Sequence, residues 1–121
     1  MDKQHKEQRS RLQKLVRKWV RPLGFGWWRI DFHYSGERHP ENPGVAGETH
    51  ADWKYSHATI TYYTPVIANM SDEELEHTFV HELCHLPMSG LKIEDSEAGY
   101  AVFERIVDDY AKHIIWAKDI K

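Results

Sequence analysis

Two histidines and a glutamate stand close together in the second half of the chain, at a spacing that can hold a metal ion. His81 and His85 are four residues apart, so on a helix both imidazoles project from one face, with Glu82 beside them. A catalytic zinc ion usually has three protein ligands and one water molecule, and a nearby carboxylate can accept a proton from that water. The sequence therefore predicts His81 and His85 as metal ligands and Glu82 as a general base.

The third metal ligand must come from outside this pentapeptide, and the acidic residues of the last predicted helix are the candidates. Glu97, Glu104 and Asp108 lie on one stripe of that helix. We predict Glu104 as the ligand, because the eighteen residues between His85 and Glu104 leave room for a loop and two helical turns. Asp108, one turn further on, would orient a ligand histidine through a hydrogen bond. Glu97 is the alternative third ligand, and it is also an acid that suits a helix N-terminus.

Other residues near the pentapeptide have less specific interpretations. His77 lies one turn before His81, but ligands from three consecutive turns of one straight helix converge poorly on a tetrahedral ion. Cys84 points away from the histidine face and is expected to be a small buried residue. The remaining histidines have no partner at ligand spacing and are expected to be surface or structural residues: His33, His39, His50, His57 and His113.

The pentapeptide lies in a predicted helix with a clear start. Ser71 and Glu74 can form a capping box there, and Pro87 is expected to end the helix after about Leu86. A last helix follows, capped by Asp95 or Ser96. This helix is predicted to extend to about Ala117, because apolar residues recur along it at helical spacing: Ala98, Val102, Ile106, Tyr110 and Ile114.

Before these two helices the sequence predicts one helix and a small sheet. Residues 1–21 form a basic amphipathic helix, and residues 27–34 alternate like a half-buried strand. Residues 48–54 and 58–63 form a β-hairpin, and the loop 35–47, rich in glycine and proline, is expected to be mobile. The order of elements predicts an α+β fold with a small mixed or antiparallel sheet and two closing helices.

The spacing of the candidate ligands resembles that of the zincin metallopeptidases of the gluzincin type. Small phage and prophage proteins with the same HExxH pattern are the nearest in pattern, and the resemblance covers residues 58–111. It implies a minimal zincin-like domain in which Zn²⁺ is held by His81, His85 and Glu104, while Asp108 supports a ligand histidine.

The same resemblance implies an activity and a substrate. The activity would be zinc-dependent hydrolysis of a peptide or protein, with Glu82 as general base. The family also places an edge strand before the motif helix, which corresponds to residues 58–63 here. An extended peptide can add to such a strand through main-chain hydrogen bonds.

Length and composition limit the other possibilities. The chain has 121 residues and a mass of 14.3 kDa, which fits a single domain spanning residues 1–121. Its single cysteine, Cys84, cannot form an internal disulfide, and no apolar stretch is long enough for a membrane span or a secretory signal. We therefore expect a cytoplasmic protein without membrane contact.

The uneven charge suggests a second hypothesis about function. Residues 1–21 carry eight lysines and arginines against two acidic residues, whereas the whole chain has a net charge of −3. A basic helix over residues 3–21 could bind nucleic acid through phosphates, although such a run is more often a solvated face. The competing hypothesis is thus a non-catalytic zincin-fold module with a structural metal, which binds protein or nucleic acid.

Overall fold

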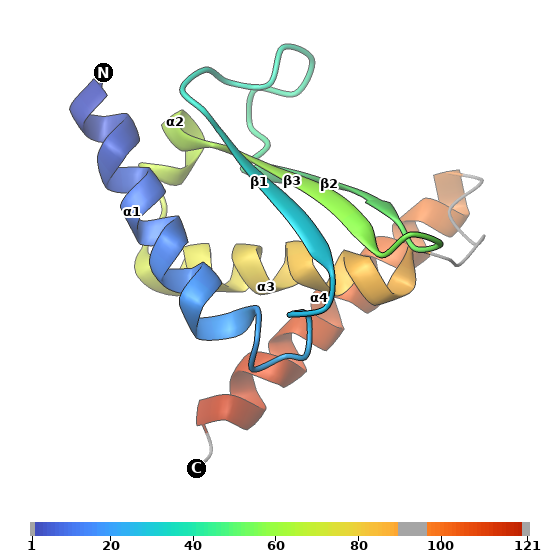
Figure 1. Ribbon diagram of the computed structural model, residues 1–121. Coiled ribbons are helices and arrows are strands. Elements are labelled where there is room, and N and C mark those ends of the chain that lie inside the picture. Colours follow the sequence, from blue (N-terminus) through green and yellow to red (C-terminus); the bar gives the residue numbers. More distant parts are fainter. Residues whose placement is uncertain (1, 90–96, 120–121) are drawn as a thin grey trace.

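The computed structural model describes residues 2–89 and 97–119 and has the predicted α+β class. The elements in chain order are α1 (Asp2–Trp19), β1 (Arg29–Ser35), β2 (Gly47–Asp52), β3 (His57–Tyr63), α2 (Thr64–Ile67), α3 (Asp72–Met88) and α4 (Glu97–Asp119). The sheet lies over α3, α4 crosses α3 on the side away from the sheet, and α1 crosses one end of α3 (Figure 1). The helix α3, which carries the HExxH pentapeptide, is therefore at the centre of the domain.

The sheet is mixed, with the strand order β1-β3-β2. β3 pairs parallel with β1 and antiparallel with β2, so the predicted hairpin is confirmed. The prediction that residues 58–63 form an edge strand is wrong, because β3 is central and β2 is an edge strand among the described residues. The physical reason is burial: Ala58, Ile60 and Tyr62 of β3 are 0–1% exposed, whereas no residue of β2 is buried. The most apolar strand takes the central position.

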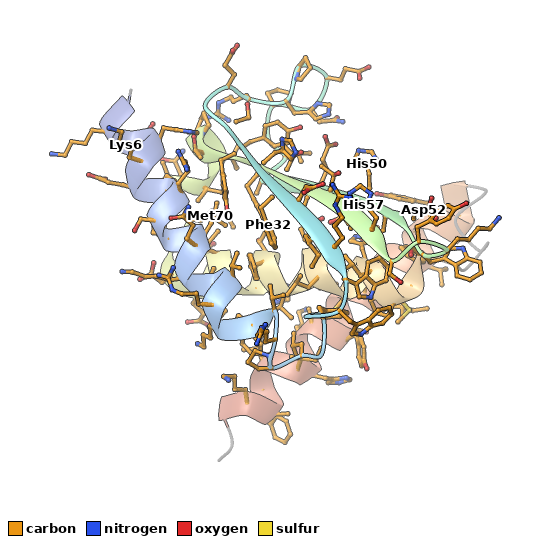
Figure 2. The ribbon with its side chains drawn as sticks, in the orientation of Figure 1. Lys6, Phe32, His50, Asp52, His57 and Met70 are labelled. Carbon is orange, nitrogen blue, oxygen red and sulfur yellow. The ribbon has the colours of Figure 1, made fainter. Side chains whose placement is uncertain are left out.

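The inner face of the sheet packs on α3 through aromatic rings. The ring of Phe79 on α3 stacks between Phe32 and Tyr62, with centroid distances of 6.0 and 5.8 Å. Figure 2 shows Phe32 on the helix side of the sheet, whereas His50 lies on the opposite face. This contact fixes the height of β3 above α3 and, through β3, the position of β2.

Helix α1 is amphipathic, as the sequence predicts. Leu12 and Trp19 are buried at 0% and 2% exposure, and they form part of the hydrophobic core. The Arg11 guanidinium donates to the backbone carbonyl of the last residue of α2 and to that of Met70 before α3, and it pairs with Asp72 at 2.9 Å. Part of the positive charge of this helix therefore holds the start of α3 in place.

Helix α3 begins as predicted but ends later. The capping box is present, since Ser71 Oγ accepts from the Glu74 backbone and the Glu74 carboxylate accepts from the Ser71 backbone. The predicted end at Leu86 is wrong, because Pro87 lies inside the last turn of the helix. A proline there removes a single backbone bond. The Ser89 hydroxyl donates to the Leu86 carbonyl at 2.8 Å and satisfies that end of the helix.

Helix α4 does not pack on α3 through the row of apolar residues from which the sequence predicted this helix. Its buried side chains are spaced four residues apart: Phe103, Val107 and Ala111. Three of the apolar residues that define the predicted helix are instead 44–55% exposed: Val102, Ile106 and Tyr110. The buried row borders Glu104 and Asp108, whose carboxylates face the histidines of α3. The predicted caps Asp95 and Ser96 lie outside the described residues.

The connecting segments add one element that the sequence did not predict. α2 is a single turn with Pro65 at its start, a position where proline fits a helix. In the loop between β1 and β2, Arg38 donates to the Pro43 carbonyl at 2.9 Å, and the mobility of residues 35–47 stays a prediction. Among the described residues no helix has the length and apolar character needed to cross a membrane.

Candidate metal centre

Two histidines of α3 converge on one carboxylate of α4. Glu104 Oε2 lies 3.1 Å from His81 Nε2 and 3.3 Å from His85 Nε2. The convergence follows from the helical repeat, which places His81 and His85 on one face of α3 opposite the acidic stripe of α4. The structure therefore brings together the three residues that the sequence predicts as metal ligands.

The donor set fits a divalent transition metal such as zinc. One ligand atom each from His81, His85 and Glu104 lies within 4.8 Å of the other two. Two imidazoles and one carboxylate form a three-ligand set typical of catalytic zinc sites, which keep a further position open. The three side chains are 16–30% exposed, so an ion held there can exchange with solvent and still be largely enclosed.

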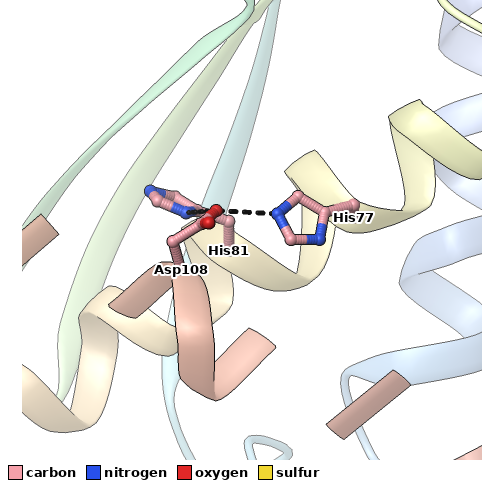
Figure 3. Close-up of side chains that lie close together, drawn as sticks. All are labelled: His77, His81 and Asp108. Carbon is pink, nitrogen blue, oxygen red and sulfur yellow. Dashed lines mark hydrogen bonds and ion pairs between the residues drawn. The ribbon is translucent and has the colours of Figure 1, made fainter. Parts of the chain in front are cut away.

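Asp108 supports the histidine row from α4. Its Oδ1 accepts from His77 Nε2 at 2.7 Å and lies 3.3 Å from His81 Nδ1 (Figure 3). The hydrogen bond from His77 is the main cause that lowers the pKa of Asp108 to about 2, with a smaller contribution from Lys112. Asp108 is therefore a carboxylate across the neutral pH range. It contacts His81 as the sequence predicts and also contacts His77, which the sequence did not predict.

Glu82 is buried beside the candidate ligands and is held by the neighbouring strand. Its side chain is 7% exposed, and Thr49 Oγ1 of β2 donates to Glu82 Oε1 at 2.6 Å. Burial raises the pKa of Glu82, while the bond from Thr49 opposes this rise. A carboxylate with a raised pKa accepts a proton more readily, which suits a general base. Sequence reasoning missed Thr49, whose only signal was its position in the strand before the motif.

The far end of the centre is shaped by two residues of α4 that sequence reasoning did not assign. Burial lowers the pKa of His85, whose ring lies 5.5 Å from that of Phe103. A neutral imidazole is the form that binds a metal. The Tyr100 hydroxyl donates to Glu104 Oε1 at 3.1 Å, so Oε2 is the oxygen that faces the two histidines.

Two small clefts flank the centre along the edge strand. One, of about 280 Å³, is lined by residues 45–47, His77, His81 and Glu82 among others. The other, of about 260 Å³, is lined by residues 49–51 and His85 among others. A larger cavity, of about 1010 Å³, lies between α3 and α4 and includes His77 but neither His81 nor His85 in its lining. Both small clefts therefore open beside the candidate ligands.

Several predicted residues lie elsewhere. The side chain of Glu97 lies outside the described residues, so its role as alternative ligand stays a prediction. His77 joins His81 through Asp108, and the described residues contain no cluster of His77, His81 and His85 around one point. Cys84 is 1% exposed, which confirms that it is buried, and burial raises the pKa of its thiol to about 12. His57 pairs with Asp31 at 2.9 Å, away from the centre.

Comparisons of this chain with protein families, with curated proteins and with solved structures found no match. The function of the centre must therefore be inferred from its own residues.

Proposed function

We propose that this chain is a zinc-dependent, metallopeptidase-like hydrolase. The observation that carries the proposal is the convergence of His81, His85 and Glu104, with the buried carboxylate of Glu82 beside them. Zinc bound to such a set would polarise a peptide carbonyl and lower the pKa of a bound water molecule.

Glu82 has the surroundings that a general base needs. Its partial isolation from solvent raises its affinity for a proton, and the Thr49 hydroxyl holds one carboxylate oxygen at 2.6 Å. The other oxygen, Oε2, has no hydrogen bond to Thr49 and is the one assigned to accept the proton from water. Glu82 would then pass that proton to the leaving amine.

Asp108 has a positioning role in this proposal. Its carboxylate lies 3.3 Å from His81 Nδ1, so it can accept the proton of that nitrogen. This leaves the lone pair of the ring on Nε2, the nitrogen that faces Glu104. Such a contact fixes both the tautomer and the orientation of a ligand histidine.

The sheet supplies a place for an extended peptide. β2 is an edge strand in the described part of the chain, and it borders both small clefts beside the centre. A peptide that adds to the free edge of β2 would run from one cleft to the other, past the candidate ligands. This role moves from residues 58–63, where the sequence placed it, to β2.

Hydrolysis by the zinc-loaded protein is the test of this proposal. Purified protein is stripped with a chelator, reloaded with one equivalent of Zn²⁺ and incubated with a broad peptide library read by mass spectrometry. We expect cleavage by the reloaded protein, and none by the stripped protein or by reloaded His81→Ala. Equal cleavage in all three samples would show a contaminating peptidase and contradict the proposal.

The choice of third ligand has its own matched pair of variants. Glu104→Ala should weaken zinc binding severely, because it removes a direct ligand from the set. Glu97→Ala, which removes an acid from the same helix, should leave the affinity unchanged. The reverse result, measured by competition with a chromogenic chelator, would assign the ligand to Glu97.

The non-catalytic alternative makes different predictions. A structural metal would stabilise the folded protein without any hydrolysis, and binding through α1 would depend on its exposed cations. Two of the cations of α1 already form ion pairs within the chain: Arg11 pairs with Asp72, and Lys18 pairs with Glu76. Folded zinc protein that cleaves nothing in the library, but binds nucleic acid with a strong salt dependence, would favour this alternative.

A further inference from the structure

The histidines of α3 and the acids of α4 form a row of five side chains, which is more than one metal site requires. We call this row the His/acid ladder: His77, His81, His85, Glu104 and Asp108. Histidines recur every four residues on α3, and acids recur at the same spacing on α4. Asp108 Oδ1 lies 2.7 Å from His77 and 3.3 Å from His81, and Glu104 Oε2 lies 3.1 Å from His81 and 3.3 Å from His85. Each acid thus sits between two histidines, and the pattern repeats after one helical turn.

We propose that His77, His81 and Asp108 form a second site for a divalent transition-metal ion, which shares His81 with the first. One ligand atom from each of these three residues lies within 4.8 Å of the other two, as in the first set (Figure 3). The cleft of about 280 Å³ is lined by all three side chains and leaves room for water to complete the coordination. Imidazole and carboxylate ligands suit Zn²⁺, Co²⁺ or Ni²⁺.

The shared histidine makes the two sites exclusive. A neutral imidazole has a lone pair on only one nitrogen. His81 presents Nε2 toward Glu104 and Nδ1 toward Asp108. An ion in the first site takes Nε2 and leaves the Nδ1 proton to Asp108, whereas an ion in the second site takes Nδ1. One chain therefore binds one ion at a time at the His/acid ladder.

The second site is the weaker of the two. The side chains of His77 and Asp108 are 30% and 37% exposed, whereas that of His85 is 16% exposed. The Lys112 ammonium also lies 3.3 Å from Asp108 Oδ2 and repels a cation there. The second site lies one helical turn from the first. An ion that enters through the cleft can bind at this weaker and more exposed site before it moves to the first site at His85.

The test disables the first site and asks whether binding survives. Binding of Co²⁺ and Zn²⁺ to the full chain is measured by calorimetry for His85→Ala, for the double variant His77→Ala/His85→Ala, and for the control His113→Ala/His85→Ala. His113 is an exposed histidine of α4 outside both ligand sets. Circular dichroism verifies that each variant is folded.

We expect His85→Ala and its His113 control to bind one ion with the same affinity. The His77→Ala/His85→Ala variant should bind at least about tenfold more weakly, because even a supporting partner of a ligand contributes about 10–100-fold. Equal affinity of His85→Ala and His77→Ala/His85→Ala would overturn the second site. That result would leave the proposed hydrolase intact, since hydrolysis is measured on the wild-type chain.

Discussion

The contact between Thr49 and Glu82 should be measurable in the free energy of unfolding. The Thr49 hydroxyl donates to Glu82 Oε1 at 2.6 Å, and Glu82 is 7% exposed. A hydrogen bond to a charged group contributes about 1.5–3 kcal/mol, so Thr49→Val should lower the free energy of unfolding by about that amount at alkaline pH. Thr49→Ser keeps the hydroxyl and loses one methyl group, so it should stay within about 1 kcal/mol of wild type.

The effect of Thr49→Val should depend on pH in a defined direction. Burial raises the pKa of Glu82 above its ordinary value of 4.5. The pKa of Glu82 is thus higher in the folded than in the unfolded protein. Protonation of Glu82 therefore stabilises the fold fully below pH 4.5, and this stabilisation is lost as the pH rises through the folded-state pKa. Thr49→Val removes a bond that favours the ionised form and raises this pKa further. Its destabilising effect should therefore be larger at alkaline than at acidic pH.

Urea denaturation of the metal-free protein, arranged as a double-mutant cycle, is the assay. Glu82→Gln removes the charge, so Thr49→Val in that background should cost only the about 0.5–1.5 kcal/mol of a neutral bond. The two substitutions should thus be coupled by about 1 kcal/mol. Equal losses for Thr49→Val in both backgrounds, or a Thr49→Ser variant as unstable as Thr49→Val, would refute the reasoning.

Four further substitutions, one of them a control, test the packing and the ligand support. Phe79→Ala should lower the free energy of unfolding by about 3–5 kcal/mol in urea, because its fully buried ring joins the sheet to α3. Gly47→Ala would place a Cβ 2.9 Å from the Tyr62 ring and should cost about 1–3 kcal/mol, whereas Gly44→Ala meets nothing within 4 Å and should be near neutral. Asp108→Ala should weaken zinc affinity about 10–100-fold in chelator competition without unfolding the protein; an unchanged affinity would remove Asp108 from the centre.

The parts of the fold that the sequence predicts are those governed by local rules. The capping box of Ser71 and Glu74 and the four-residue spacing of His81 and His85 involve neighbours within one helical turn. The β-hairpin likewise depends on two adjacent segments and a short turn. Each of these features was predicted because its interactions lie close together along the chain.

The features that were missed depend on contacts between distant segments. In the sheet β1 pairs with β3, although β2 lies between these two strands in the sequence. No local sequence pattern shows this strand order. On α4, apolar rows lie one residue apart, and the contact with α3 selects the row of Phe103 over that of Val102. Thr49 contacts Glu82 for the same reason, since only the folded sheet brings β2 beside α3. The contact between Tyr100 and Glu104 is different, because the two residues lie one turn apart on α4 and their spacing is a local signal that was missed.

The zinc content and peptide cleavage of Glu82→Gln, measured on the same samples, test the central claim most directly. If Glu82 acts on water and does not hold the metal, the variant should be folded, carry about one zinc per chain like the wild type, and cleave no peptide in the library. A variant that loses zinc as fully as His81→Ala, or one that cleaves at the wild-type rate, would contradict the assignment of Glu82 as the base of a zinc hydrolase.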